Sequence, residues 1–214
     1  MSEPTDMVGV EGANMSEQTT TPKLGERFSH AVTFAADKHR RQVRKGGDIP
    51  YLGHLLSVAG LVIEAGGTEN EAIAALLHDA VEDAGGEETL AEIRAIFGEE
   101  VAGIVDECSD TVITPKPPWK ARKQAYVDHL SEASEGAVLV SLADKLDNAR
   151  AILRDLRRHG DGLWQRFSVK DPGEHLWYYG SLLESFDQRR PDCPMVAELR
   201  RVLQAWREEL AGAC

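Results

Sequence analysis

A histidine and three acidic residues lie close together in the sequence, directly after a run of apolar residues. His78 and Asp79 are adjacent, and Glu82 and Asp83 follow four residues after them. Residues four apart on a helix stack on one face, so His78 would pair with Glu82 and Asp79 with Asp83. Imidazole nitrogens and carboxylate oxygens are typical ligands of a divalent metal ion. His78 alone would more simply be a helix-end histidine that bonds a backbone carbonyl.

Two further polar residues lie in apolar helical surroundings. His54 lies in the segment YLGHLLSVAGLV, and Asp144 lies in AVLVSLADKLDNAR. An ionised aspartate on an apolar stripe is costly unless it is paired or bound to a metal. Together with His78 and Asp79, these residues make a set of two imidazoles and two carboxylates. Such a set suits a six-coordinate divalent ion better than structural zinc, which prefers a closed four-coordinate site.

The net charge of −12 limits what the protein can bind. An acidic protein does not attract the backbone of a nucleic acid, so nucleic-acid binding is not expected. An anionic ligand must instead meet a local basic patch or a metal. The segment KHRRQVRKGG, residues 38–47, is such a patch. Within it, Arg40 and Arg41 suit the C-terminal end of a helix, where the helix dipole favours cations.

Helices must position these residues, because the sequence repeats apolar residues at helical spacing and has no alternating run that requires a strand. We therefore predict an all-α fold. The expected helices cover residues 24–39, 53–65, 69–84, 87–98, 99–109, 120–133, 137–158, 172–186 and 194–211. Glycines and prolines predict a loop at 44–51 and a break at 159–162.

The length of 214 residues is enough for one domain with a substantial core, which we place at residues 23–214. Residues 1–22 are polar and predict a disordered lead-in without the order of a signal peptide. No segment has the roughly 20 apolar residues of a membrane span, so no membrane association is expected and the cytoplasm is the default location. The three scattered cysteines favour neither a disulfide framework nor a zinc ribbon. Nothing in the sequence sets an oligomeric state.

Several motifs together resemble a known family. His54, His78-Asp79 and Asp144 reproduce the H…HD…D pattern of the HD-domain phosphohydrolase superfamily. The segments AADKHRRQVRKGGDIPYLGHLLSVA, ALLHDAVEDA, FGEEVAGIVDECSD and LVSLADKLDNAR resemble the hydrolase domain of the RelA/SpoT alarmone enzymes, and more closely the small stand-alone alarmone hydrolases. The resemblance covers roughly residues 28–186. It implies an HD-domain helical bundle without the synthetase domain of the larger enzymes.

The resemblance also implies roles for the polar residues. His54, His78, Asp79 and Asp144 would bind one divalent ion, Mn²⁺. Glu82 and Asp83 would position and deprotonate a water molecule, with the ion lowering its pKa. As purely structural acids they would be poorly placed, because the dipole disfavours negative charge at a helix C-terminus.

A nucleotide-binding set follows from the same resemblance. Arg44 would stack on a purine base, Lys45 would meet phosphate, and Asn148 would contact the base or ribose. A lysine that flanks the proline-rich turn would also reach the phosphates; Lys116, Lys120 and Lys123 are the candidates, and Lys120 is the favoured residue. Tyr178 is a candidate for the ribose–phosphate pocket. His39 and Arg150 are assigned structural roles.

The implied activity is hydrolysis of the 3′-pyrophosphate of guanosine tetra- or pentaphosphate, (p)ppGpp, to GDP or GTP and pyrophosphate. The chain departs from the family at Leu55, Ala84, Gly46 and Asp147, where relatives usually have Pro, Thr, Ser, and His or Tyr. None of these is a metal ligand, but each could alter substrate preference. The alternatives are a phosphohydrolase acting on the 2′-phosphate of NADPH or on a nucleoside monophosphate, and a catalytically silent alarmone-binding module.

Overall fold

The regular secondary structure is helical, as the sequence predicts. The computed structural model describes residues 24–109, 115 and 117–212, so the predicted lead-in at residues 1–22 lies outside the described residues. The helices are α1 (Glu26–Lys38), α2 (Leu52–Glu64), α3 (Glu69–Leu77), α4 (Ala80–Asp83), α5 (Gly86–Phe97), α6 (Glu99–Cys108), α7 (Trp119–His129), α8 (Glu135–His159), the 3-10 helix η1 (Gly160–Arg166), α9 (Pro172–Arg189) and α10 (Pro194–Gly212). None of these helices is long and apolar enough to span a membrane.

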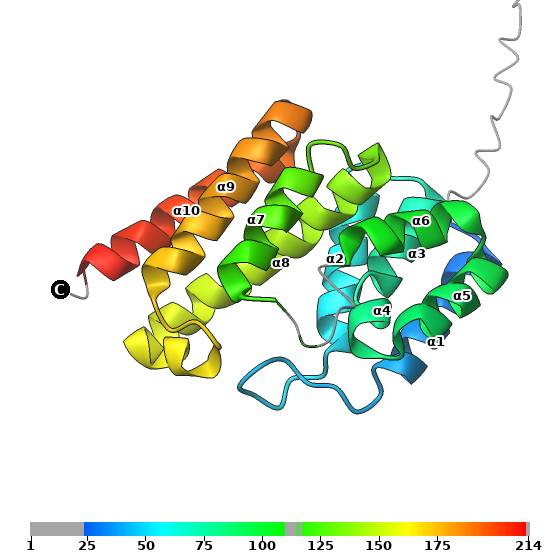
Figure 1. The fold of residues 1–214 in the computed structure, drawn as a ribbon, viewed down its shortest axis with the longest axis horizontal. Helices are drawn as coiled ribbons and strands as arrows, with labels where there is room; N and C mark the ends of the chain where they lie inside the picture. The colour runs from blue at the N-terminus through cyan, green and yellow to red at the C-terminus, as the bar shows by residue number, and fades with distance from the viewer. Residues whose placement is uncertain (1–23, 110–114, 116, 213–214) are drawn as a thin grey trace, which may run out of the picture.

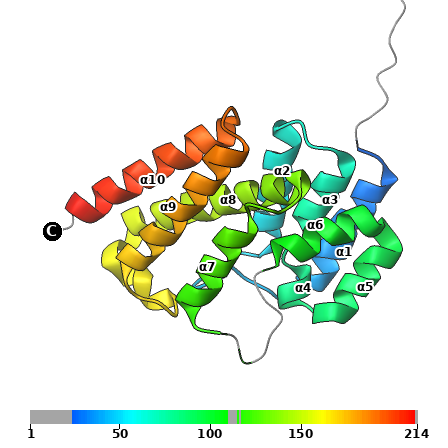
Figure 2. The same cartoon turned by 45° about the horizontal axis from the view of Figure 1, so that its top comes forward.

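Helix α8 runs through the middle of the molecule and joins two groups of helices. It has 25 residues and begins after Ser134, whose hydroxyl accepts a hydrogen bond from the Ala137 N–H. It ends where Gly160 adopts a positive φ of 55°. Helices α2, α3 and α6 pack on α8 from one group, and α9, α10 and η1 pack on it from the other (Figures 1 and 2). A residue on α8 can therefore contact elements from both halves of the chain.

Helix α3 is the buried centre of the N-terminal group and contacts α1, α2, α6 and α8. Its residues 72–77 are all fully buried, with relative exposures of 0%. A capping box between Thr68 and Glu71 fixes its first turn. Truncation of a buried leucine such as Leu76 to alanine would cost roughly 2–5 kcal/mol of folding free energy. The residue that follows α3 is thus delivered from a rigid, closely packed helix.

The helix predicted over residues 69–84 is in fact two helices. Helix α3 ends at Leu77, and the four-residue helix α4 begins at Ala80. The imidazole Nδ1 of His78 donates to the Ala75 carbonyl, the group to which the Asp79 N–H would bond in a continuing helix. Glu82 and Asp83 therefore do not lie at the C-terminus of a long helix. The expectation that the dipole of such a helix disfavours their negative charge was wrong.

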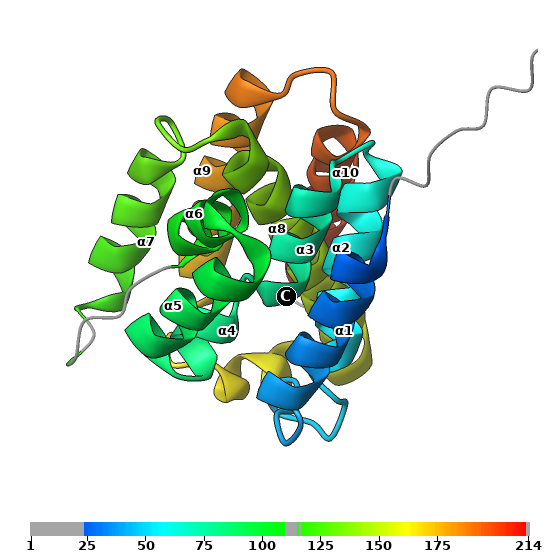
Figure 3. The same cartoon turned by 90° about the vertical axis from the view of Figure 1, so that its right-hand side faces the viewer.

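The loop between α1 and α2 packs against η1 and brings the basic segment beside α8, where Arg44 bonds Asn148. An antiparallel bridge between Val43 and Pro50 holds the two ends of the loop together. A 2.8 Å hydrogen bond from the Arg44 N–H to the Ile49 carbonyl has the same effect. Gly46, at the tip, has a φ of 79°, and a Cβ placed there would lie 2.3 Å from Cδ of Arg166. Figure 3 shows this loop below α1, close to the end of α8 and η1.

Candidate metal centre and adjoining cavity

Two buried histidines from different helices face one another. The rings of His54 on α2 and His78 after α3 have centroids 5.4 Å apart. Each uses Nδ1 for a hydrogen bond: His54 with Asp147 Oδ2 at 2.6 Å, and His78 with the Ala75 carbonyl at 2.8 Å. Both Nε2 atoms are buried without a hydrogen-bond partner in the described residues. An imidazole whose Nδ1–H is donated presents a lone pair at Nε2, the arrangement of a metal ligand.

Two aspartates approach these nitrogens. Asp144 Oδ1 on α8 lies 3.1 Å from His54 Nε2 and 3.6 Å from His78 Nε2. Asp79 Oδ2 lies 3.1 Å from His78 Nε2 and 3.8 Å from His54 Nε2. One ligand atom each from His54, His78 and Asp144 lies within 4.8 Å of the other two, so these atoms fit around a single ion. The structure thus brings the four predicted ligands together from α2, the α3–α4 junction and α8.

The electrostatics of the group match the requirements of a cation site. Burial disfavours charged imidazoles, but the carboxylates of Asp144 and Asp147 outweigh it and raise the pKa of His54. Asp79 and Asp144 similarly raise the pKa of His78 against the effect of burial. Burial opposes ionisation of Asp79 as well, yet His78 holds the pKa of this aspartate well below its ordinary value. A divalent cation here would supply the positive charge that the two carboxylates otherwise draw from protons.

Asp147 supports His54 from behind. Its Oδ2 accepts from the imidazole, and its Oδ1 accepts a 2.6 Å hydrogen bond from the Ser57 hydroxyl. Arg44 adds a more distant ion pair with Asp147, at 3.9 Å. From the sequence, residue 147 appeared only as a departure from relatives. Its position three residues after Asp144, on the same face of α8, was the available signal.

The two aspartates of the centre are also held by neighbours that the sequence reasoning missed or placed elsewhere. Asp144 accepts hydrogen bonds of 2.5 Å from Lys145 Nζ and from Asn148 Nδ2. The Tyr51 hydroxyl donates to Asp79 Oδ2. Asn148, predicted to contact the nucleotide, therefore bonds directly to the carboxylate of a candidate metal ligand. From the sequence, Tyr51 appeared only within the segment that resembles the alarmone hydrolases, and no role was assigned to it.

The two predicted catalytic acids lie in α4, after the metal-site residues. Asp83 Oδ2 accepts a 2.8 Å hydrogen bond from Gln42 Nε2, and Gln42 Oε1 is 2.6 Å from His39 Nδ1. Partial desolvation and the nearby carboxylates of Asp79 and Glu82 raise the pKa of Asp83, although Gln42 opposes them. A carboxylate with a raised pKa beside a cation site can accept a proton from water. Gln42 was not foreseen.

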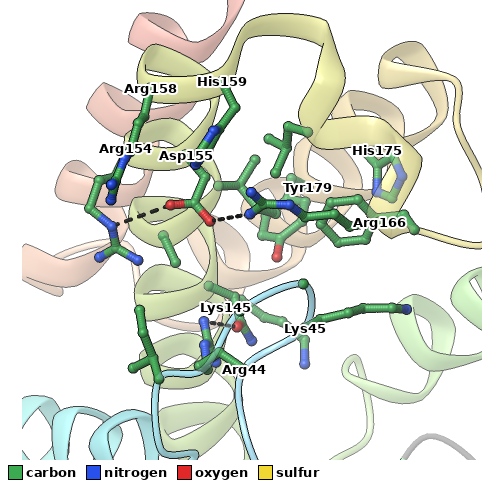
Figure 4. Close-up of a pocket in the computed structure, with 18 of the residues that line it drawn as sticks. Arg44, Lys45, Lys145, Arg154, Asp155, Arg158, His159, Arg166, His175 and Tyr179 are labelled. Carbon is green, nitrogen blue, oxygen red and sulfur yellow. Dashed lines mark hydrogen bonds and ion pairs between the residues drawn. The ribbon is translucent and has the colours of Figure 1, made fainter.

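A cavity of about 510 Å³ adjoins the candidate metal centre, and Figure 4 shows residues that line this cavity. Its walls come from the loop at 44–51 and from α7, α8, η1 and α9, and it shares Tyr51, Lys145 and Asn148 with the surroundings of the metal site. Seven lysines and arginines line it against two aspartates: Arg44, Lys45, Lys123, Lys145, Arg154, Arg158 and Arg166 against Asp48 and Asp155. In a protein of net charge −12, this concentration of cations favours an anionic ligand.

Four of the five predicted substrate-binding residues line this cavity: Arg44, Lys45, Asn148 and Tyr178. Arg44 donates a 2.9 Å hydrogen bond to Asn148 Oδ1, and the ammonium of Lys45 lies 5.6 Å from the centre of the Phe167 ring.

Lys120, the fifth, is not brought to the cavity. It pairs with Glu174 at 2.8 Å and lies over the Trp177 ring. Lys123, one helical turn later on α7, lines the cavity and lies 5.0 Å from the centre of the Tyr178 ring.

Comparison with known proteins gives a consistent set of matches. The HD domain family matches residues 31–172. Relatives named guanosine-3′,5′-bis(diphosphate) 3′-pyrophosphohydrolase MESH1 are 41% identical in Xenopus tropicalis and 42% identical in Homo sapiens, each over 66% of this chain and 75% of the relative. A solved structure described as a metazoan orthologue of SpoT that hydrolyses ppGpp has a TM-score of 0.70 and 28% identity. The match covers 87% of this chain and 97% of that one.

Proposed function

The chain belongs to the HD domain family, and from that premise we propose that it hydrolyses the 3′-pyrophosphate of (p)ppGpp. The reaction breaks the bond between the ribose 3′-oxygen and the pyrophosphate. Water supplies hydroxide to the pyrophosphate and a proton to the 3′-oxygen, and the products are GDP or GTP and pyrophosphate. The observation that carries the proposal is a pair of buried imidazole nitrogens beside two aspartates, without a hydrogen-bond partner in the part of the chain that the structure describes, next to a cation-lined cavity.

We propose that His54, His78, Asp79 and Asp144 hold one divalent ion, Mn²⁺. Nitrogen and carboxylate ligands with positions left for water suit this ion. The ion would supply charge stabilisation for the phosphate oxygens and a lowered pKa for the attacking water. The Nδ1 hydrogen bonds of both histidines support this assignment, because they leave Nε2 as the coordinating atom.

We propose that Glu82 and Asp83 position the attacking water and accept its proton. The raised pKa of Asp83 supports such a role, because proton acceptance is most effective when the pKa of the base approaches the working pH. Gln42 would position Asp83 through its 2.8 Å hydrogen bond. Glu82, which is half-buried, would orient the water from the preceding position.

In the cavity, Arg44 would stack on the purine base while Asn148 contacts the base or ribose. Lys45 would meet phosphate, and Lys123 in place of Lys120 would be the α7 lysine that meets the pyrophosphate. Lys123 lies over Tyr178, which shares the cavity wall with Lys145, the partner of Asp144. This arrangement would place positive charge on both sides of the pyrophosphate, the group that the water attacks.

We further propose that residues 23–214 form a single hydrolase domain that acts in the cytoplasm on a small nucleotide. The net charge of −12 argues against a nucleic-acid ligand.

A substrate panel tests the proposed activity. The protein would be assayed with Mn²⁺ against ppGpp, pppGpp, NADPH and nucleoside monophosphates, with the products separated by chromatography. Pyrophosphate and GDP should form from ppGpp, and the Asp79→Ala variant should release neither. Phosphate release from NADPH without pyrophosphate release from ppGpp would instead identify the 2′-phosphatase alternative.

A further inference from the structure

The cavity has a second cationic end, away from the metal centre. The residues of α8 that line it include Asn148, Ile152, Asp155 and His159, which recur every three or four positions and so share one face. Asp155 follows Asn148 by seven residues, about 10 Å along the helix at 1.5 Å per residue. In Figure 4, Arg44 and Lys145 lie toward one end of this face, and Arg154, Arg158 and His159 lie toward the other.

A single aspartate, Asp155, pairs with two of the three arginines at that end. Arg166 NH1 lies 3.1 Å from Asp155 Oδ2, and Arg154 Nε lies 3.5 Å from Asp155 Oδ1. Arg158 lines the cavity and forms no ion pair with any residue that the structure describes. Two guanidiniums thus share the Asp155 carboxylate and the third, Arg158, has no carboxylate partner in the described part of the chain, which leaves an excess of positive charge. Guanidinium groups offer planar, two-pronged donors that match phosphate oxygens.

Arg166 is built into the wall. Its side chain is 23% exposed and lies against Gly46, where any Cβ would come within 2.3 Å of it. The loop that carries Arg44 and Lys45 therefore contacts the arginine group, which consists of Arg154, Arg158 and Arg166, through Arg166. Cations in the last turn of α8 would also suit its dipole, and that accounts for Arg158. The dipole of α8 does not account for Arg166, because this residue belongs to η1 and its side chain pairs with Asp155.

We propose that Arg154, Arg158 and Arg166 form an anion subsite for the diphosphate on the 5′-carbon of the nucleotide ribose. The inference rests on the proposed function, because it takes the metal centre as the site of the 3′-pyrophosphate and Arg44 as the contact of the base. A nucleotide held in this way extends its 5′-chain along α8, away from Asp144. Asp155 pairs with Arg154 and Arg166 before any ligand arrives, and Arg166 also lies against Gly46, so little ordering cost remains for these two side chains on binding.

Kinetics with guanosine 3′-diphosphates that carry zero, one, two or three 5′-phosphates test the subsite. Arg158→Gln should lower the ratio of kcat/KM for ppGpp to kcat/KM for the 5′-hydroxyl compound by about 10- to 100-fold, as expected for loss of a charge-assisted contact. Arg157→Gln is the matched control, because Arg157 pairs with Glu209 and does not line this cavity. The control should keep the wild-type ratio. An Arg158→Gln ratio equal to that of wild type would overturn the proposal.

A binding measurement separates failure of the subsite from failure of the proposed function. Calorimetry of the Mn²⁺-loaded protein would compare GDP with guanosine, and ADP with adenosine, without any turnover. Wild type should bind each diphosphate at least about 10-fold more tightly than its nucleoside, and Arg158→Gln should lose most of that preference. The ADP arm reports whether the subsite serves adenine nucleotides as well as guanine nucleotides. Equal preferences in wild type and Arg158→Gln would exclude the subsite even if ppGpp is hydrolysed. Absence of pyrophosphate release with an intact preference would exclude only the hydrolase activity.

Discussion

Asp147 accepts a hydrogen bond from Nδ1 of His54 at 2.6 Å, across 93 positions of sequence. The bond fixes both the tautomer and the orientation of a proposed metal-binding imidazole. Ser57 in turn fixes the carboxylate through its other oxygen.

Asp147→Ala should therefore weaken metal binding by about 10- to 100-fold, the usual effect of removing such a supporting partner. Calorimetry with Mn²⁺ measures this directly. Asp106→Ala, at an exposed aspartate on α6, serves as the control and should bind the ion as wild type does. An unchanged affinity in Asp147→Ala would mean that His54 is oriented by its packing alone.

Glu82→Gln should lower kcat by about 10²- to 10⁴-fold with little change in metal affinity, because it removes an acid–base group without removing a proposed metal ligand. Steady-state kinetics on ppGpp, paired with Mn²⁺ titration, separates the two effects. If kcat stays at the wild-type value, Asp83 with its raised pKa is the sole proton acceptor.

Stabilisation by metal should grow with pH. In the metal-free protein, neighbouring carboxylates outweigh burial and raise the pKa of both His54 and His78. Groups with raised folded-state pKa stabilise the metal-free fold fully below about pH 6.5, their ordinary value, and this stabilisation is lost as pH rises through the folded pKa. Metal binding has the opposite dependence, because the imidazoles must release protons.

The gain in Tm on adding Mn²⁺ should accordingly be larger at pH 8 than at pH 6. Thermal unfolding with and without the ion across this range provides the measurement. A gain that is the same at every pH would show that the ion does not compete with protons for these two histidines.

The preference for guanine should depend on Asn148. Stacking on Arg44 tolerates any purine, whereas a hydrogen-bonding site penalises an analogue that lacks the matching groups. We expect a higher kcat/KM for ppGpp than for its adenine counterpart, a smaller gap in Asn148→Ala, and weaker binding of both in Arg44→Ala. Because Asn148 also donates to Asp144, Mn²⁺ affinity should be measured in the same variant. Equal kcat/KM for the two nucleotides in wild type would contradict the guanine-specific part of the proposal.

That His54, His78, Asp79 and Asp144 come together could be predicted because their signal is local. His54 and Asp144 each interrupt an apolar helical stripe, and His78 with Asp79 follows a fully apolar turn. The break between α3 and α4 could not be predicted, because it accompanies a side-chain bond from His78 to the Ala75 carbonyl that helix propensity does not reveal. The sequence could not show that Lys123, and not Lys120, lines the cavity. Which lysine of α7 faces the cavity depends on how α7 packs against α9.

The arginine group has no local signature. Arg166 lies 120 positions from Gly46 in sequence, and their contact exists only because η1 and the α1–α2 loop fold onto each other. From the sequence, Gly46 suggested merely the loss of a hydroxyl from the pocket. In the structure the missing side chain leaves room for a guanidinium stem, which changes the chemistry of that wall.

The path of α8 has a consequence for how the protein opens. An ion at the proposed site would bind residues from α2, the α3–α4 junction and α8 at once, and so close a chain loop of some ninety residues, between His54 and Asp144. Separating these helices would then require release of the ion, because no pair of them could move apart alone. Amide hydrogens in α2, α3 and the first half of α8 would exchange with solvent as one cooperative unit.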